Sequence, residues 1–274
     1  MDLRGPTSQI IMRAKRSLGQ NFLTSEKIVA DIVGAAGLSQ DDIILEVGPG
    51  RGILTGGLLK NSKKIIAVEK DDGLFDFLRE KFAQEIESEK LILIHGDILD
   101  PRLNIPRLNK GGYKLVSNIP YNITGKIIIK FLSAKNRPEM MVLLLQKEVA
   151  ERITAKDGKE SLLSISVKAY GKPKYIKKVS RIFFSPKPKV DSAILLIDEI
   201  SQTFFKNFPE KEFFTLVKSG FAHKRKKLLN NLKEIGLEPS RIFKEMGLSE
   251  NIRAERLKPK EWLELAKKTK SRYS

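Results

Sequence analysis

Four consecutive residues in the middle of the chain could hold an amino group that is carried on a flat ring. Asn118 offers a side-chain amide and Tyr121 offers an aromatic face. Between them, Ile119 and Pro120 offer backbone carbonyls in a turn that the proline stiffens. An ordinary turn with a packing tyrosine would contain the same residues. The choice between the two depends on what chemistry the preceding chain brings to this point.

A glycine-rich turn upstream is typical of a nucleotide-binding loop. The apolar run Ile43–Val47 predicts a buried parallel strand, and Gly48-Pro49-Gly50-Arg51-Gly52 and a helical pattern follow it. The dinucleotide fingerprint needs a glycine where this chain has Ile53, and the acidic Glu46 precedes the turn. Because a carboxylate repels a pyrophosphate, the pattern favours the cationic cofactor S-adenosylmethionine. A plain tight turn would also use these glycines.

Acidic residues follow the next two predicted strands. The strand Lys64–Val68 ends at Glu69, about 20 residues beyond the acid before the glycine turn, where a carboxylate commonly accepts ribose hydroxyls. The strand Leu91–Ile94 leads to Asp97, which could accept the amino group of an adenine or cap the next turn. Because parallel strands end at one edge of a sheet, these acids should meet Asn118 there.

The overall pattern predicts two domains. The chain has 274 residues, 41% hydrophobic and 31% charged, which is typical of a soluble globular protein. Strands and helices alternate to about residue 198, so we expect an α/β domain over residues 1–198, with residues 1–12 flexible. Only helical patterns follow, which predicts a small all-α domain over residues 199–274. No bilayer-spanning run or signal peptide is evident, so we expect a cytoplasmic protein with no membrane association.

The charge of the chain indicates a polyanionic partner. The net charge of +18 favours nucleic acid over membrane, although a solubilising surface could also be basic. The cluster Lys224, Arg225, Lys226 and Lys227 lies in a pattern that predicts a helix over 224–235. With no cysteine and two histidines, the sequence predicts no disulfide and no metal site.

A loop near the end of the α/β domain has aromatic and basic residues together. Prolines within 183–190 exclude a regular central strand. Phe183 and Phe184 beside Lys187 and Lys189 match a base-stacking surface with phosphate contacts, although we expect one of the two rings to pack in the core. The remaining patterns predict helices at 125–132, 147–153, 162–169, 211–221, 239–246 and 259–270, a strand at 140–145, and an antiparallel pair at 174–179 and 191–197.

Taken together, these residues resemble the ribosomal RNA adenine dimethyltransferases, the KsgA-type methylases of small-subunit rRNA. The resemblance runs from about Ser17 to the C-terminal helices. It rests on motifs that agree in order and spacing: Leu18–Leu23, Glu46–Gly50, Glu69, Gly96–Asp97, Asn118–Asn122 and Phe184–Ser192.

The resemblance implies a Rossmann-like S-adenosylmethionine-dependent methyltransferase domain with a mostly parallel seven-stranded sheet. Asn21 and Leu23 would close over the methionine end of S-adenosylmethionine, Glu69 would bind its ribose, and Asp97 its adenine amino group. The full set of implied cofactor contacts is Gln20, Asn21, Leu23, Gly48, Gly50, Glu69, Lys70, Asp97, Ile98 and Asn118. The family's product is a pair of adjacent dimethyladenosines near the 3′ end of small-subunit rRNA.

The expected mechanism needs an adenosine that leaves its stack. The Asn118 side-chain oxygen and the carbonyl of Ile119 or Pro120 would accept its amino hydrogens. Tyr121 would stack on one face of the base and Phe184 on the other, with Phe183 as the alternative to Phe184. Transfer is then an in-line displacement that depends on positioning and needs neither a metal nor a covalent enzyme intermediate.

The expected partner is the small ribosomal subunit or its precursor, bound by a monomer through its rRNA, and a ribosome-biogenesis checkpoint role could accompany catalysis. One alternative is a large-subunit rRNA adenine methylase of the macrolide-resistance type. Against this alternative, the basic stretch Phe221–Leu232 resembles the pattern of the small-subunit enzymes. The match is approximate, because His223 precedes its first basic residue, Lys224. Another alternative is a non-catalytic RNA-binding or transcription factor, against which the intact Asn118–Tyr121 loop argues.

Overall fold

The computed structural model describes residues 19–105, 108, 112–156 and 158–273. Residues 1–12, which we expected to be flexible, lie outside this part of the chain. So do Ser17 and Leu18, where the resemblance begins. No helix among the described residues is long and apolar enough to cross a membrane.

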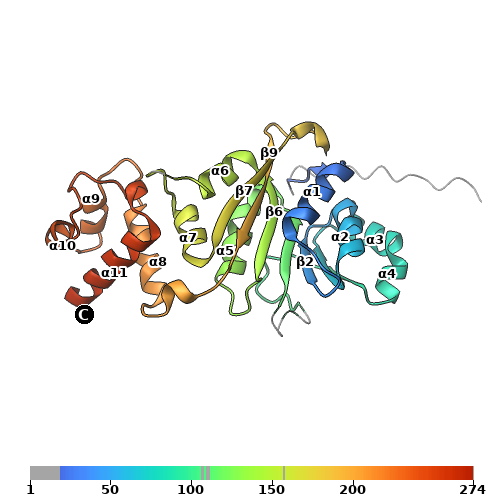
Figure 1. Ribbon diagram of the computed structural model, residues 1–274, viewed down its shortest axis with the longest axis horizontal. Coiled ribbons are helices and arrows are strands. Elements are labelled where there is room, and N and C mark those ends of the chain that lie inside the picture. The colour runs from blue at the N-terminus through green and yellow to red at the C-terminus, as the bar shows by residue number, and fades with distance from the viewer. Residues whose placement is uncertain (1–18, 106–107, 109–111, 157, 274) are drawn as a thin grey trace, which may run out of the picture.

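A seven-stranded sheet forms the centre of the α/β domain (Figure 1). Its strand order is β4-β3-β2-β5-β6-β9-β7. The strands from β4 to β6 are parallel, and β9 runs antiparallel to both of its neighbours. The mostly parallel sheet and the closing antiparallel pair are therefore confirmed. The strands are β2 (Ile43–Val47), β3 (Lys64–Glu69), β4 (Leu91–His95), β5 (Lys114–Asn118), β6 (Met140–Gln146), β7 (Lys172–Val179) and β9 (Ser192–Asp198).

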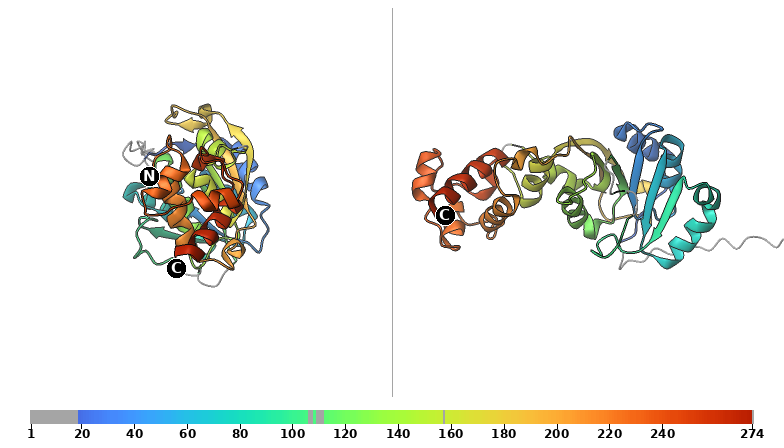
Figure 2. Two further views of the ribbon diagram at one scale, coloured as in Figure 1. Left: turned by 90° about the vertical axis from the view of Figure 1, so that its left-hand side faces the viewer. Right: turned by 90° about the horizontal axis from the view of Figure 1, so that it is seen from below.

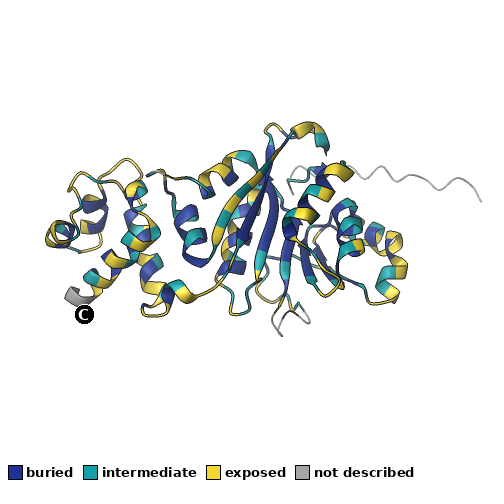
Figure 3. Ribbon diagram, viewed as in Figure 1, coloured by how far each residue is buried: buried dark blue, intermediate teal, exposed yellow. Residues whose placement is uncertain are grey.

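Helices cover both faces of this sheet, because alternate residues of each strand point to opposite sides. Ile44 and Ile65 belong to the apolar cluster that includes residues of α1, α2 and α3. Leu45 and Ile66 belong to the cluster that includes residues of α5, α6 and α7. The strands at the centre of the sheet are coloured mostly as buried in Figure 3. The helices are α1 (Glu26–Ala36), α2 (Ile53–Asn61), α3 (Asp72–Lys81), α4 (Ala83–Glu87), α5 (Thr124–Leu132), α6 (Lys147–Ile153) and α7 (Leu162–Tyr170).

The helical segment that follows lies at one end of an elongated molecule (Figure 2). Its core is continuous with one face of the sheet, since Trp262 and Phe213 belong to the same apolar cluster as Leu45. Tyr170 of α7 packs against Phe205 and Phe214, with ring centroids 5.2 and 5.8 Å apart. The two parts therefore share one core. The helices of this segment are α8 (Glu210–Gly220), α9 (Leu228–Lys233), α10 (Ser240–Glu245) and α11 (Pro259–Tyr273).

The loop 183–190 adds no strand to the central sheet, as its prolines predicted; its two-residue strand β8 (Phe184–Ser185) pairs antiparallel with β1 (Phe22–Leu23) in a separate sheet. One local prediction was wrong. The helix predicted over 224–235 is α9, which begins only at Leu228. The amide of buried Asn231 donates to the carbonyls of Gly220 and His223, so the preceding basic segment is held as a turn instead of a helix.

Two adjacent glycines in α2 provide a test of how closely α1 and α2 pack. A Cβ added at Gly57 would lie 2.3 Å from Cγ1 of buried Val29, whereas one added at Gly56 would meet no atom within 4 Å. We expect Gly57→Ala to destabilise the protein by about 1–3 kcal/mol through overpacking. Gly56→Ala should stabilise it by about 0.5–1 kcal/mol through helix propensity. Urea unfolding of both variants measures this, and equal effects would contradict the packing argument.

Candidate cofactor and base-binding site

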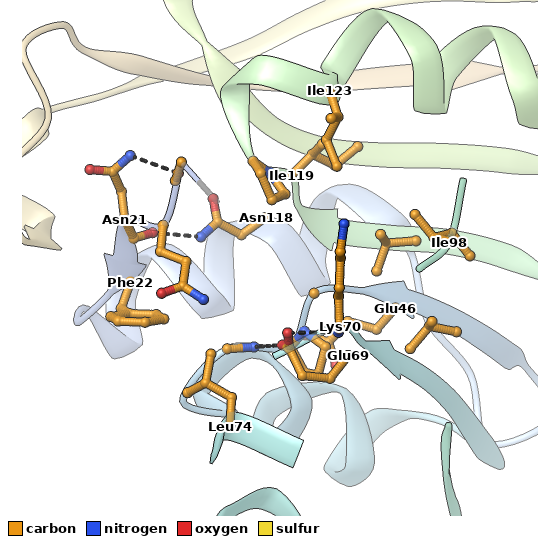
Figure 4. A pocket seen from close by; sticks show the side chains of 18 of the residues that line it. Asn21, Phe22, Glu46, Glu69, Lys70, Leu74, Ile98, Asn118, Ile119 and Ile123 are labelled. Atoms are coloured by element: carbon orange, nitrogen blue, oxygen red, sulfur yellow. Dashed lines mark hydrogen bonds between the residues drawn. The ribbon is translucent and has the colours of Figure 1, made fainter. Parts of the chain in front are cut away.

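The loops after β2, β3, β4 and β5 line one pocket at the carboxyl edge of the parallel strands (Figure 4). This is the arrangement that strand order predicts for an open α/β sheet. The pocket is lined by every residue that we expected to contact the cofactor and by all but one of the residues expected to act on the base: Gln20, Asn21, Leu23, Gly48, Gly50, Glu69, Lys70, Asp97, Ile98, Asn118, Ile119, Pro120 and Tyr121.

The glycine turn gives the pocket a floor of bare backbone. Gly48 and Gly50 have φ angles of 65° and 59°, in the left-handed region that side chains disfavour. The Gly48 amide donates to the carbonyl of Val68, 2.9 Å away, which joins the turn to β3. A Cβ at Gly50 would lie 3.0 Å from the ring of Phe22. A larger residue there would therefore occupy space at the pocket wall.

Glu69 connects two of these loops through hydrogen bonds to backbone amides. Its Oε1 accepts from the amides of Lys70 and Asp71 at 2.9 Å each, and its Oε2 accepts from the Gly50 amide at 3.1 Å. Burial raises the pKa of this carboxyl, and the three amide hydrogen bonds oppose that effect. Because a carboxylate oxygen can accept two hydrogen bonds, Oε2 has capacity for a ribose hydroxyl.

An ion pair spans the outer part of the pocket. The ammonium of Lys70 lies 2.9 Å from Oδ2 of Asp97, and Oδ1 of Asp97 accepts from the Leu99 amide at 2.8 Å. These interactions, the Leu99 amide first, hold the pKa of Asp97 below its usual value. The carboxyl of Asp97 both caps the turn and faces the pocket. Capping the turn and accepting a hydrogen bond from an adenine amino group are therefore compatible roles.

Glu46 is buried beneath the turn. Its Oε2 accepts from the Thr55 hydroxyl at 2.7 Å, and the residue is 1% exposed. Burial raises the pKa of this carboxyl to about 8; the Thr55 bond opposes the shift and the charge of Glu69 adds to it. Glu46, Glu69 and Asp97 all line the pocket, together with the cations Arg51 and Lys70. Because its raised pKa leaves Glu46 protonated at neutral pH, the carboxylate charge comes from Glu69 and Asp97.

This lining fits S-adenosylmethionine better than a dinucleotide. A sulfonium and an ammonium are favoured beside the carboxylates of Glu69 and Asp97, whereas a pyrophosphate is repelled by them. Glu69, which three backbone amides orient, can accept a hydrogen bond from a hydroxyl group. The Gly48–Gly50 turn has no side chain beyond that of Pro49, so a nucleoside can approach its backbone. Among the described residues, no group of three or more histidine, aspartate, glutamate or cysteine side chains could hold a metal ion.

The amide of Asn118 is oriented by a contact from a distant segment. Its Nδ2 donates to the carbonyl of Asn21 at 3.2 Å, as Figure 4 shows. Because the amide nitrogen is engaged in this bond, Oδ1 is the atom left to accept a hydrogen bond. Behind it, the Ser117 hydroxyl donates to the Val47 carbonyl at 2.6 Å, which ties β5 to β2.

The structure favours Ile119 over Pro120 as the second acceptor. The Pro120 carbonyl already accepts from the Ile123 amide at 3.2 Å and from the Thr124 hydroxyl at 3.3 Å. The Ile119 amide donates to the Leu144 carbonyl at 3.1 Å, which anchors the peptide before the turn. The hydroxyl of Tyr121 lies 2.7 Å from the Ser192 hydroxyl, so the ring is held at its outer end.

Phe184 does not line this pocket. It is 4% exposed and packs in the apolar cluster of Leu23 and Val179, while Phe183 is partly buried against the same cluster. Burial of one of the two rings was expected, but the sequence assigned the stacking role to the ring that the structure buries. The stacking of Phe184 on a base stays a prediction that requires its side chain to leave this packing.

The expected RNA-binding residues are exposed and separate from the pocket. Lys187 and Lys189 are exposed in the loop after β8, and Lys224 to Lys227 are exposed in the turn between α8 and α9. Lys226 forms an ion pair with Glu234 at 2.7 Å, which also pairs with His223 at 3.0 Å. In the described part of the chain, Lys224, Arg225 and Lys227 have no ion-pair partner.

Two further residues that line the pocket, Phe22 and Leu74, were not among those expected from the sequence. Phe22 lies between Asn21 and Leu23, both of which we expected in the site, and the guanidinium of Arg51 lies 4.7 Å from its ring centroid. Leu74 enters the pocket from the first turn of α3, whose N-cap Asp71 accepts from the Leu74 amide. The position of Phe22 within a recognised motif could have identified it.

The chain is similar over most of its length to ribosomal RNA methyltransferases. The model of the family described as ribosomal RNA adenine dimethylase matches residues 11–271. A protein of Dehalococcoides mccartyi named ribosomal RNA small subunit methyltransferase A is 41% identical over 264 residues, covering 93% of this chain and 88% of that protein. A protein of Fusobacterium nucleatum with the same name is 39% identical, covering 92% and 96% of the two chains.

Two solved structures resemble the fold along most of its length. A dimethyladenosine transferase from Plasmodium falciparum has a TM-score of 0.74 at 26% identity, covering 91% of this chain and 98% of that one. The 23S rRNA methyltransferase ErmE has a TM-score of 0.72 at 25% identity, covering 91% and 100%.

The protonation of Glu46 should make stability depend on pH. Its folded-state pKa of about 8 lies above the value of 4.5 expected when unfolded, so between these values only the folded chain holds the proton. The free energy of unfolding should then fall as pH rises through this window, by up to about 1.4 kcal/mol per pH unit. Glu46→Gln, which can still accept from Thr55, should remove this component. Urea unfolding of both proteins at pH 5.5, 7 and 8.5 tests it; parallel profiles would contradict a protonated Glu46.

Proposed function

Because the chain belongs to the ribosomal RNA adenine dimethylase family, we propose that it transfers methyl groups from S-adenosylmethionine to two adjacent adenosines near the 3′ end of small-subunit rRNA. The acceptor on each is the exocyclic amino group, and the product is dimethyladenosine. The observation that carries this proposal is the oriented amide of Asn118 beside the pocket that Glu69, Asp97 and the bare glycine turn line.

The residues of the loop activate the amino group by holding it. The lone pair of an adenine amino nitrogen is delocalised into the ring, which makes it a weak nucleophile. In the first transfer, Oδ1 of Asn118 and the Ile119 carbonyl accept hydrogen bonds from its two N–H groups and favour the tetrahedral geometry of the attacking nitrogen; in the second, the one remaining N–H donates to one of them. Tyr121, anchored by Ser192, supports the plane of the base. These contacts strengthen as positive charge develops on the nitrogen, so they stabilise the transition state.

The opposite side of the pocket positions the donor. When bound, S-adenosylmethionine supplies a methyl group activated by a positively charged sulfur. Oε2 of Glu69 would accept a ribose hydroxyl, Asp97 would accept a hydrogen bond from the adenine amino group, and the Gly48–Gly50 turn would hold the cofactor through its backbone. Asn118 lies at the boundary of the two subsites, where its contact with Asn21 keeps the amide in one orientation.

The names of the curated relatives support the small subunit as substrate. The similarity to ErmE keeps a large-subunit substrate as the alternative within the fold. Transfer of a radiolabelled methyl group to unmethylated small and large subunits, with identification of the nucleoside, separates the two. Label in dimethyladenosine of the small subunit alone is the expected result, and label in the large subunit alone would overturn the assignment. Absence of any transfer would favour a non-catalytic RNA-binding factor.

The cellular setting of the reaction belongs to the same proposal. We expect a monomer that acts in the cytoplasm on the small subunit or its precursor. A methylase that docks tightly and turns over slowly would also serve as a checkpoint in subunit maturation, so the two roles are compatible. The exposed basic residues at Lys187, Lys189 and 224–227 supply the phosphate contacts for docking.

Replacing Asn118 should separate cofactor binding from catalysis. We expect Asn118→Ala to retain affinity for S-adenosylhomocysteine within a few-fold. Methyl transfer should fall by a hundredfold or more, since losing an oriented acceptor costs about 3–4 kcal/mol of barrier. Calorimetry and single-turnover transfer measure the two effects. Asn61→Ala, at the end of α2, is a matched amide control that should leave both unchanged. Near-normal transfer by Asn118→Ala would contradict the assignment.

The basic turn before α9 should contribute to electrostatic docking. Joint replacement of Lys224, Arg225 and Lys227 by alanine should reduce the slope of log affinity against log salt by about two to three, since each phosphate contact contributes about 0.7–0.9. Filter binding to small subunits at several salt concentrations measures this.

The matched control replaces three lysines near the amino edge of the parallel strands, Lys60, Lys63 and Lys90, which removes the same charge. It should leave the slope nearly unchanged. An equal change in both triple variants would mean that net charge, and not this turn, determines docking.

A further inference from the structure

A rigid loop beside the pocket exposes an isoleucine. Ile182 is 62% exposed, the highest fraction among the exposed large hydrophobic residues of the described chain, and Val190 on the same loop is 44% exposed. Burying an isoleucine stabilises a protein, so this exposure has a cost. Single exposed apolar residues are nevertheless common, and the position and surroundings of Ile182 distinguish it from them.

The loop is held in one conformation by several hydrogen bonds. The Ser180 hydroxyl accepts from the Ile182 amide at 3.4 Å, and the Arg181 guanidinium donates to the Lys189 carbonyl at 2.9 Å. Asp191 accepts from the Arg181 amide at 3.1 Å and pairs with Lys178 at 2.9 Å. These hydrogen bonds fix the turn that exposes Ile182. A side chain on a fixed turn loses little conformational freedom when it inserts into a partner.

The turn is also tied to the pocket wall. The amide and hydroxyl of Thr24 donate to the Phe183 carbonyl at 2.9 and 3.0 Å, and Leu23 pairs with Phe184. Leu23 and Phe22 line the pocket. On the other side of the loop, Ser192 holds the hydroxyl of Tyr121. Ile182 is therefore the neighbour of residues that are hydrogen-bonded to the segment 22–24, of which Phe22 and Leu23 line the pocket.

The surroundings of Ile182 favour RNA as its partner. Arg181, Lys187 and Lys189 are exposed on the same loop. Cations around an apolar tip suit a phosphate backbone on either side of a base stack. A base that is extruded leaves a gap in its stack, and proteins commonly insert an apolar side chain between base steps. The buried ring of Phe184 does not reach out of the loop in this structure, whereas Ile182 does.

Resting on the proposed function, we propose that Ile182 inserts into the base stack of the substrate RNA next to the extruded adenosine and keeps the gap open. Val190 supports it from the same loop, and the flanking cations bind the phosphates. The residue acts on the base stack and touches neither the cofactor nor the reacting nitrogen, so it is a positioning residue.

The test compares Ile182→Ala with Ile176→Ala, a matched exposed isoleucine in the middle of β7 that is 43% exposed. Small subunits are reconstituted with rRNA that carries 2-aminopurine in place of the target adenosine, and unmodified subunits serve for transfer. Ile182→Ala should lower single-turnover methyl transfer tenfold or more and reduce the rise in 2-aminopurine fluorescence on binding. Its affinities for S-adenosylhomocysteine and for the subunit should change less than threefold. Ile176→Ala should match the wild-type protein in methyl transfer, fluorescence and both affinities.

Two further variants at position 182 distinguish insertion from other contacts. Ile182→Leu should restore transfer and fluorescence, because it keeps the apolar volume. Ile182→Lys should not, and restoration by lysine would overturn insertion in favour of a phosphate contact. Unchanged transfer by Ile182→Ala, or a loss of subunit affinity that accounts for its slower transfer, would also overturn it. If the unmodified protein methylates neither subunit, the proposed function fails and this proposal fails with it; if it methylates normally and Ile182→Ala does too, only this proposal fails.

Discussion

The buried carboxylate of Glu69 is the interaction on which the geometry of the pocket depends. It accepts hydrogen bonds from the amides of Gly50, Lys70 and Asp71, and thereby joins the turn after β2 to the loop after β3. Amides in such positions would otherwise lose hydrogen bonds on burial, which is costly. One side chain therefore orients two loops and keeps acceptor capacity for a ligand hydroxyl. The geometry of the cofactor half of the site therefore depends on hydrogen bonds between Glu69 and the backbone of two loops.

The base half of the site depends on contacts between segments that are far apart in sequence. Asn21 orients Asn118 across 97 positions, and Thr24 holds Phe183 across 159. The β1–β8 pair and the Tyr121–Ser192 contact complete the same rim. Because these contacts join the pocket wall to the loop 180–192, the position of Ile182 relative to Asn118 is set by the same interactions. The geometry at Asn118 and the insertion proposed for Ile182 would thus depend on the same contacts.

The helical segment is joined to the catalytic part through a common core. Tyr170 packs among Phe205 and Phe214 and donates to Glu210, while Arg137 lies above its ring. The division at residue 199 stays a prediction that describes a change in secondary structure; the apolar cluster runs across it without interruption. A shared core holds the basic turn 221–227 at a fixed position relative to the pocket. Docking through that turn would therefore orient the active site as well as increase affinity.

Sequence alone determined the α/β alternation and the shared edge of Glu69, Asp97 and Asn118, because these follow from local periodicity and the geometry of parallel strands. The other expected cofactor contacts came from the resemblance to a known family, and all of them line the pocket. The tertiary structure decided what local patterns cannot encode. It buried Phe184, engaged the Pro120 carbonyl and so favoured Ile119, and delayed the start of α9 to Leu228. Two of these outcomes, the burial of Phe184 by the β1–β8 pairing and the start of α9 imposed by Asn231, come from side chains or strands brought together only by folding.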